Sequence, residues 1–176
     1  MMRFRTMFLA AACGVAMMAA PPRAAAESGE KSPNAVGSYL WAFLGLGPGL
    51  HVPGLVTLTS DGTLISVTGS DQGGPDTVFH VKNSAAHGVW FDTGRRSVGA
   101  RALFLNFDPV GGEVVSITKV RISAQFDKKF NNATGEFFQS VWVCTTGPFT
   151  CPDPLTDPPT VPESPTGLPF TAKRIQ

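Results

Sequence analysis

Histidine and cysteine are scarce in this chain, with three of each among 176 residues. His51, His80 and His87 are scattered and have no cysteine, histidine or carboxylate partners at short spacing, so they form no metal-ligand set. The sequence also contains no nucleophile elbow, phosphate loop, dinucleotide fingerprint or zinc signature. We therefore expect no metal and no cofactor, which excludes the commonest classes of cofactor-dependent enzyme.

Charged residues are also few, at 15% of the chain. The basic pairs Arg95-Arg96 and Lys128-Lys129 stand alone in predicted turns. Binding of nucleic acid requires a much larger basic surface, because its affinity comes mainly from phosphate contacts. Nucleic acid is therefore not an expected partner, and both pairs are interpreted as solvated loop charges.

Long apolar runs are absent except for residues 7–20, which follow Arg3 and Arg5 and precede Ala24-Ala25-Ala26. A positive start, an apolar run and small residues, in that order, are typical of a signal peptide. The run is shorter than the roughly 20 residues that span a bilayer. A lipoprotein signal ending at Cys13 is the alternative, although it would leave a very short apolar segment.

We predict that residues 1–26 are the signal peptide and that the mature protein is periplasmic or extracellular, with no integral membrane segment. Removal of the signal peptide leaves 150 residues. The number of basic residues falls from 14 to 11, and the number of acidic residues stays at 13. Residues 27–34 are polar and predicted to be a flexible N-terminus. Residues 35–176 are enough for a single domain with its own core.

Two cysteines remain in the predicted mature chain, Cys144 and Cys151. They are separated by a few residues that include the Gly147-Pro148 turn signal. In an oxidising compartment, two such cysteines predict one disulfide. It would join the end of a strand to the loop that follows.

No segment after residue 26 has the 3.6-residue periodicity of an amphipathic helix, whereas period-two alternation recurs along the chain. Turn signals separate the alternating runs, and Ser60-Asp61-Gly62 is the clearest hairpin turn. Residues 77–83 fit either a short strand or a helical turn. Residues 146–169 contain eight of the fifteen prolines and predict a long extended loop. The predicted strands are residues 35–44, 55–60, 63–68, 87–92, 97–108, 113–127, 136–145 and 170–175.

The central pair of strands carries the strongest pattern. Residues 87–92 and 97–108 are joined by a tight turn at Thr93-Gly94-Arg95-Arg96, and both faces of the second strand are mostly apolar with single polar interruptions. That pattern is typical of a strand in a small closed barrel. We predict an all-β fold, an antiparallel up-and-down barrel of about eight strands, with the Pro-rich loop before the last strand. Such a barrel is either filled by side chains or able to hold one small ligand.

Four blocks of the sequence carry a resemblance: Gly37-Ser38-Tyr39, LVTLTSDGTL at residues 55–64, HGVW followed by TGR at residues 87–95, and TAKRI at residues 171–175. Together they resemble a group of exported, uncharacterised bacterial proteins. Those proteins are similar to calycins (lipocalins and relatives) and to allene oxide cyclase-like barrels. The resemblance implies a calycin-like barrel and either a ligand-binding or an isomerase or cyclase activity.

Six residues are candidates for a site. His87 lies at the mouth of a strand and could transfer protons, because the pKa of free histidine lies near physiological pH; hydrogen bonding to the backbone at a barrel end is the alternative. Arg101 either points inward, where it needs an anionic partner, or outward as a solvated side chain. Aromatic residues on strands are either core or ligand wall. The candidate ligand-binding residues are Tyr39, Trp90, Arg101, Asn106 and Gln139.

The sequence therefore favours an exported β-barrel that binds a small, mostly apolar molecule in its interior. A cofactor-free isomerase or cyclase is one alternative. A filled barrel with a structural role in the cell envelope is another. The volume and lining of the interior distinguish these three possibilities, because a binding site needs a concave apolar space with a few fixed polar groups.

Overall fold

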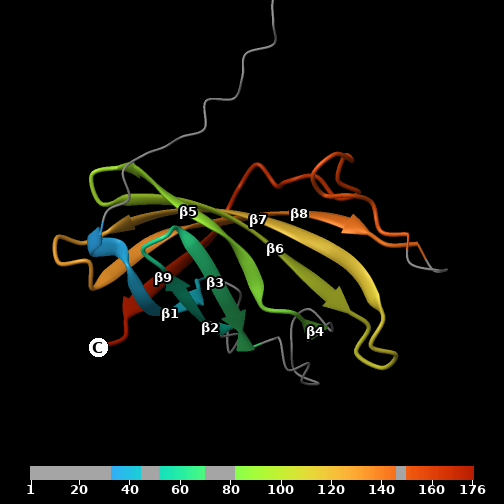
Figure 1. Cartoon of the computed structure of the whole chain (residues 1–176), viewed down its shortest axis with the longest axis horizontal. Coiled ribbons are helices and arrows are strands. Elements are labelled where there is room, and N and C mark those ends of the chain that lie inside the picture. The colour runs from blue at the N-terminus through green and yellow to red at the C-terminus, as the bar shows by residue number, and fades with distance from the viewer. Residues whose placement is uncertain (1–32, 45–51, 70–81, 146–149) are drawn as a thin grey trace, which may run out of the picture.

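The computed structural model describes residues 33–44, 52–69, 82–145 and 150–176 (Figure 1). The predicted signal peptide, His51, His80 and the Gly147-Pro148 turn lie outside these ranges. The described part contains nine strands, one short 3₁₀ turn and no α-helix. The elements are η1 (Pro33–Ala35), β1 (Gly37–Phe43), β2 (Pro53–Leu58), β3 (Thr63–Thr68), β4 (Lys82–Asn83), β5 (Ala86–Gly94), β6 (Ser97–Phe107), β7 (Val114–Phe126), β8 (Asn132–Val143) and β9 (Leu168–Arg174).

Eight of these strands close into an antiparallel barrel in the order β1-β2-β3-β5-β6-β7-β8-β9, and β9 pairs back to β1. Each strand therefore pairs with its neighbours along the chain, which confirms the predicted up-and-down barrel and is consistent with a calycin-like fold. The ninth strand, β4, lies outside this ring of eight. It pairs with the end of β6 through Asn83 and Asn106. For residues 77–83 the sequence left open a strand or a helical turn. The last two of these residues, Lys82 and Asn83, form a strand.

The alternation along β6 divides the two faces of the barrel wall as the sequence predicted. Val98, Ala100, Ala102 and Asn106 are buried inside, whereas Arg101 is exposed on the outer face. A period of two places successive side chains on opposite faces of a strand. The same alternation continues on β7 and β8, so one set of residues from every strand faces a common interior.

One end of the barrel is closed by packed side chains, and we call it the closed end. It carries the β2–β3, β5–β6 and β7–β8 turns, of which the last two lie at the left of Figure 1. The predicted Asp61-Gly62 hairpin turn is confirmed, with Gly62 at φ 88°. Trp90 fills this end and donates its indole N–H to the carbonyl of Thr59 at 2.9 Å. Tyr39, near the start of β1, packs against Phe126, near the end of β7, with ring centroids 5.4 Å apart.

The predicted start of β8 was wrong by four residues, because the strand begins at Asn132 and not at residue 136. The carboxylate of Asp127 accepts hydrogen bonds from the Asn132 side chain at 2.8 Å and from two backbone amides, which closes a shorter turn. These bonds, that from Asn132 first, hold the pKa of Asp127 below its ordinary value. Gly135, which the sequence places at the end of the turn, lies inside the strand. A Cβ there would come within 2.1 Å of the Ser123 carbonyl.

The described part of the Pro-rich segment before β9, residues 150–167, is a loop, as predicted, and it folds back over the outer face of β8. Only the first half of β8 pairs with β9, so the second half would present a free edge. Val141 and Val161 cover that edge with two mutual backbone hydrogen bonds of 2.9 and 3.0 Å. Trp142 donates its indole N–H to Asp157, also at 2.9 Å.

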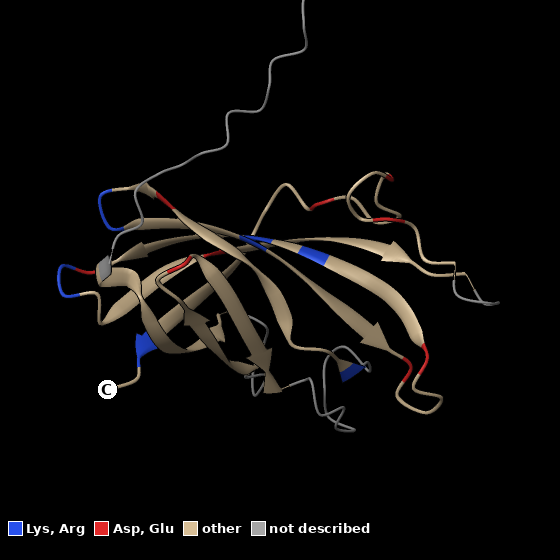
Figure 2. Cartoon of the chain, in the orientation of Figure 1, with Lys and Arg blue, Asp and Glu red and all other residues tan. Residues whose placement is uncertain are grey.

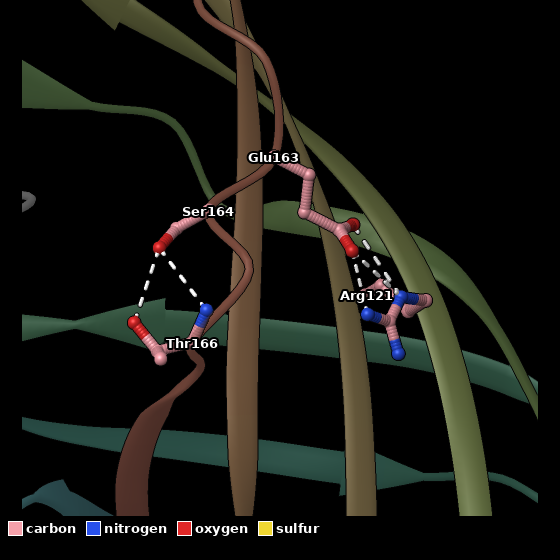
Figure 3. A network of polar contacts seen from close by, with 4 residues as sticks. All are labelled: Arg121, Glu163, Ser164 and Thr166. Carbon is pink, nitrogen blue, oxygen red and sulfur yellow. Dashed lines mark hydrogen bonds and ion pairs between the residues drawn. The ribbon is translucent and has the colours of Figure 1, made fainter.

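Two further links hold this segment. The predicted Cys144–Cys151 disulfide is confirmed, with an S–S distance of 1.98 Å. Arg121 of β7 pairs with Glu163 at 2.5 Å, and Ser164 and Thr166 contact each other in the next turn (Figure 3). No described segment forms a helix long and apolar enough to cross a membrane.

Candidate ligand-binding cavity

A cavity of about 280 Å³ occupies the barrel interior beyond the closed end. Every strand of the ring contributes its inward-facing side chains to the wall of the cavity. Most of this wall is apolar. This volume is just below the roughly 300–1,000 Å³ of typical small-molecule sites. The apolar lining includes Tyr39, Trp41, Phe43, Leu58, Leu64, Val98, Ala100, Ala102, Phe104, Val120, Ile122, Ala124, Phe126, Ala133, Phe137, Phe170 and Ala172.

Small side chains keep this space open. Ala102 and Val120 face each other across β6 and β7, and Ala133 pairs with Ala172 across β8 and β9. Eight-stranded barrels are just wide enough for their side chains to fill the interior. Alanine at these inward positions therefore leaves room that leucine or phenylalanine would occupy.

Aromatic rings form another part of the wall. Trp41 of β1 lies edge-on to Phe43 with ring centroids 4.8 Å apart, and Phe43 contacts Phe137 at 5.2 Å in the same manner. The Trp41 ring lies directly over Gly54 of β2, where a Cβ would approach the ring to 2.5 Å. Its indole N–H is bonded to Ser66 at 3.2 Å. These contacts fix the ring positions, so the wall is formed before any ligand enters.

A polar cluster interrupts the apolar wall on β6 and β7. Asn106 donates its amide N–H groups to the hydroxyl oxygens of Ser116 and Thr118, each at 2.8 Å. Asn106 is 7% exposed and Thr118 is 3% exposed. Buried polar groups are costly unless they are hydrogen-bonded, and here they bond to one another.

All described residues that line the cavity are uncharged at neutral pH. Tyr39 is held protonated, because burial raises the pKa of its hydroxyl, an effect partly offset by the nearby Arg174 charge. That hydroxyl donates to the Ala35 carbonyl at 2.9 Å. The cavity therefore offers hydrogen-bonding groups without a counter-ion.

The cavity wall contains three of the sequence candidates, namely Tyr39, Asn106 and Gln139. Trp90 is not part of the lining, because it is packed into the closed end. His87 lies exposed on the outer face of β5, between Ile65 and Leu103 of the neighbouring strands. The proton-transfer candidate is therefore separate from the cavity lining.

Arg101 takes the outward orientation of the two that the sequence left open. Its guanidinium lies 5.7 Å from the centre of the Phe91 ring. It faces a second hollow of about 360 Å³ between the Pro-rich segment and the outer faces of β6–β8, together with Lys119 and Arg121. Figure 2 shows basic positions on neighbouring strands near the middle of the molecule. Arg101 thus has no route to a ligand inside the barrel.

Two lining residues that complete the polar cluster, Ser116 and Thr118, were not among the sequence candidates. The sequence alone shows that Ser116 and Thr118 share one face of a strand with Val120. The missing information was the pairing of β6 with β7, which sets Asn106 directly opposite Ser116. Register of this kind depends on turn geometry and on which faces are buried.

Within the described ranges, no group of three or more histidine, cysteine, aspartate or glutamate residues could hold a metal ion. Comparison with protein-family models, with curated proteins and with solved structures found no match for this chain.

Proposed function

We propose that this barrel binds one small, neutral, mostly apolar molecule in its interior. The observation that carries the proposal is the 280 Å³ cavity, whose mostly apolar wall includes the uncharged polar cluster of Asn106, Ser116 and Thr118. Removing apolar surface from water contributes about 25 cal/mol per Å², so an apolar ligand gains affinity from the wall alone. The prearranged aromatic rings lower the ordering cost on binding.

The uncharged lining supports a neutral ligand over an anionic one. A carboxylate inside the barrel would lose its hydration, and no described lining residue is a cation that could replace it. The effective penalty for burying an unpaired ion is several kcal/mol. Arg101, which the sequence offered as a carboxylate partner, lies on the outer face.

We further propose that the protein works outside the cytoplasm, after removal of residues 1–26, as a calycin-like binding protein. The Cys144–Cys151 disulfide supports this, because disulfides persist in oxidising compartments. The intact mass of protein recovered from periplasm or medium is expected to correspond to a chain beginning at Glu27. Recovery of the uncleaved chain from that fraction would contradict the export proposal.

The cavity is tested by titration with N-phenyl-1-naphthylamine, an uncharged apolar dye whose fluorescence rises in apolar surroundings. We expect saturable binding with one site, accompanied by quenching of Trp41, which lines the cavity. Ala102→Phe places a ring in the space that alanine leaves open and is expected to weaken the dye by about tenfold or more, or about 1.4 kcal/mol. Circular dichroism confirms that the variant is folded.

The matched control is Leu103→Phe, which adds a ring at the next position of β6 on the outer face. Its dye affinity is expected to equal that of the wild type. The outer face also carries an exposed apolar row, Leu40, Leu55 and Val67, paired across β1–β3. If Leu55→Ser abolishes the signal and Ala102→Phe does not, the dye binds outside and the proposal is wrong.

A further inference from the structure

We propose that Asn106, Ser116 and Thr118 form a hydroxyl-binding subsite, so that the ligand is a neutral alcohol or phenol held by its O–H group. The inference rests on the proposed binding function and goes further, because it assigns the ligand class and its orientation. Its basis is the set of hydrogen-bonding positions on these three side chains that no described residue occupies.

The first observation concerns the hydrogen bonds that the side-chain amide of Asn106 makes. Its nitrogen lies 2.8 Å from both the Ser116 and the Thr118 hydroxyl oxygen, and 3.4 Å from the Ser116 backbone carbonyl. The carbonyl can only accept, which favours the nitrogen on this side of the amide. The cluster uses only the nitrogen of the amide, and no described residue donates a hydrogen bond to Asn106 Oδ1.

The second observation concerns the two hydroxyl groups. Because both accept from Asn106, each still has its own O–H hydrogen to donate. Among the described residues, none accepts a hydrogen bond from either hydroxyl. The cluster therefore presents one acceptor and two donors, all on residues that line the cavity.

A ligand hydroxyl is the simplest group that matches this set, because it donates one hydrogen bond and accepts others. It would donate to Asn106 Oδ1 and accept from Thr118 or Ser116. A ketone or ether oxygen can only accept, which would leave the amide oxygen without a partner. A carboxylate would in addition bring a charge that no described lining residue neutralises.

The position of the cluster gives the orientation. Asn106 lies near the end of β6 and Ser116 near the start of β7, at the opposite end of these strands from the closed end. The apolar side chains of Ala102 and Val120 follow on the same two strands toward the closed end. The ligand hydroxyl is therefore placed at the polar cluster, and its apolar body extends inward.

The test is displacement of N-phenyl-1-naphthylamine by three matched compounds: naphthalene, 2-naphthol and 2-naphthoate. At neutral pH only the last is charged. In the wild type, 2-naphthol is expected to bind about tenfold more tightly than naphthalene or 2-naphthoate, since a site built to bond a hydroxyl rejects analogues that lack it. Asn106→Leu is expected to reduce this preference to about threefold or less while naphthalene binds as before.

Thr118→Val removes one hydroxyl with little change in shape and keeps the test available if Asn106→Leu fails to fold. It is expected to weaken 2-naphthol and not naphthalene. The control is Ser66→Ala, which removes a lining hydroxyl bonded to Trp41, outside the cluster. Its preference for 2-naphthol is expected to match that of the wild type.

The outcomes separate the two proposals. If naphthalene and 2-naphthol bind the wild type equally, or if Asn106→Leu and Thr118→Val both retain the preference, the hydroxyl subsite is wrong and the apolar cavity stands. Tightest binding of 2-naphthoate overturns the neutral-ligand argument. If neither the dye nor any of the three compounds binds, the proposed function fails and the subsite fails with it.

Discussion

Gly88→Ala is expected to lower the free energy of unfolding by about 3 kcal/mol, a large effect for the addition of one methyl group. Gly88 of β5 lies opposite Ala102 of β6, where the two strands approach closely. A Cβ at this position would lie 2.0 Å from the Arg101 carbonyl oxygen and 2.5 Å from the Ala102 Cα. Both are backbone atoms, so relief requires the strands to separate and their hydrogen bonds to lengthen.

Urea denaturation of the oxidised protein measures this effect, and Gly111→Ala is the matched control. Gly111 lies in the β6–β7 turn, and the nearest atom to an added Cβ is a side-chain oxygen of Asp108 at 3.6 Å, an ordinary contact. The control is expected to change stability by less than about 0.5 kcal/mol. Equal denaturation midpoints for the two variants would show that the strands at Gly88 are not as close as described.

Trp90→Ala is expected to cost about 3–5 kcal/mol, the range for removing a large buried aromatic side chain. Trp90 is 1% exposed and holds the β2–β3 turn through two hydrogen bonds of 2.9 Å, from its indole to Thr59 and from its backbone to Gly62. Truncation would leave a void in the closed end and release the turn. The neighbouring Val89→Ala is the control, because Val89 is 57% exposed on the outer face.

The same residue separates closure of the barrel from ligand binding. Trp90→Phe keeps a ring in the closed end, and the dye affinity is expected to remain that of the wild type, because Trp90 is outside the cavity lining. Thermal unfolding and dye titration of the same preparations give both values. A strong loss of dye affinity in Trp90→Phe, with Val89→Ala unchanged, would place the ligand at the closed end and contradict the assignment.

The barrel architecture was predictable because its information is local. Alternation separated the two faces of β6 correctly, and the Asp61-Gly62 turn marked its hairpin. Closure was harder, since it depends on β1 pairing with β9 across most of the chain. The number of strands and their order along the chain implied this pairing, and no local pattern did.

The site was only partly predictable, for two physical reasons. Alternation assigns a residue to a face of the strand and does not give its depth along the barrel axis. Trp90 and Asn106 therefore appeared equivalent in the sequence. In the structure Trp90 closes the end of the barrel, whereas Asn106 lines the cavity. Arg101 could not be oriented from its apolar neighbours, because small residues occur on both faces of β6. The partners of Asn106 required the β6–β7 register, which the turn at residues 108–113 sets.

The Pro-rich segment shows a further limit. Its composition predicts a loop, and it is a loop, yet proline content does not reveal what the segment covers. Trp142 lies on the outer face of β8 and is 3% exposed because this segment packs over it. The sequence signal for this covering was the large aromatic side chain of Trp142 on the outer face of β8. That signal could be recognised only after the inward face of β8 was known.

The most direct test of the central claim is a crystal structure of the mature, oxidised protein grown with iodobenzene, with the iodine located by its anomalous signal. Apolar cavities of this kind bind small apolar molecules such as benzene. We predict an iodine peak inside the barrel, between the Ala102–Val120 wall and the aromatic rings of Trp41 and Phe170. An interior filled by side chains, with iodine only on the outer apolar row of Leu40, Leu55 and Val67, would contradict the account.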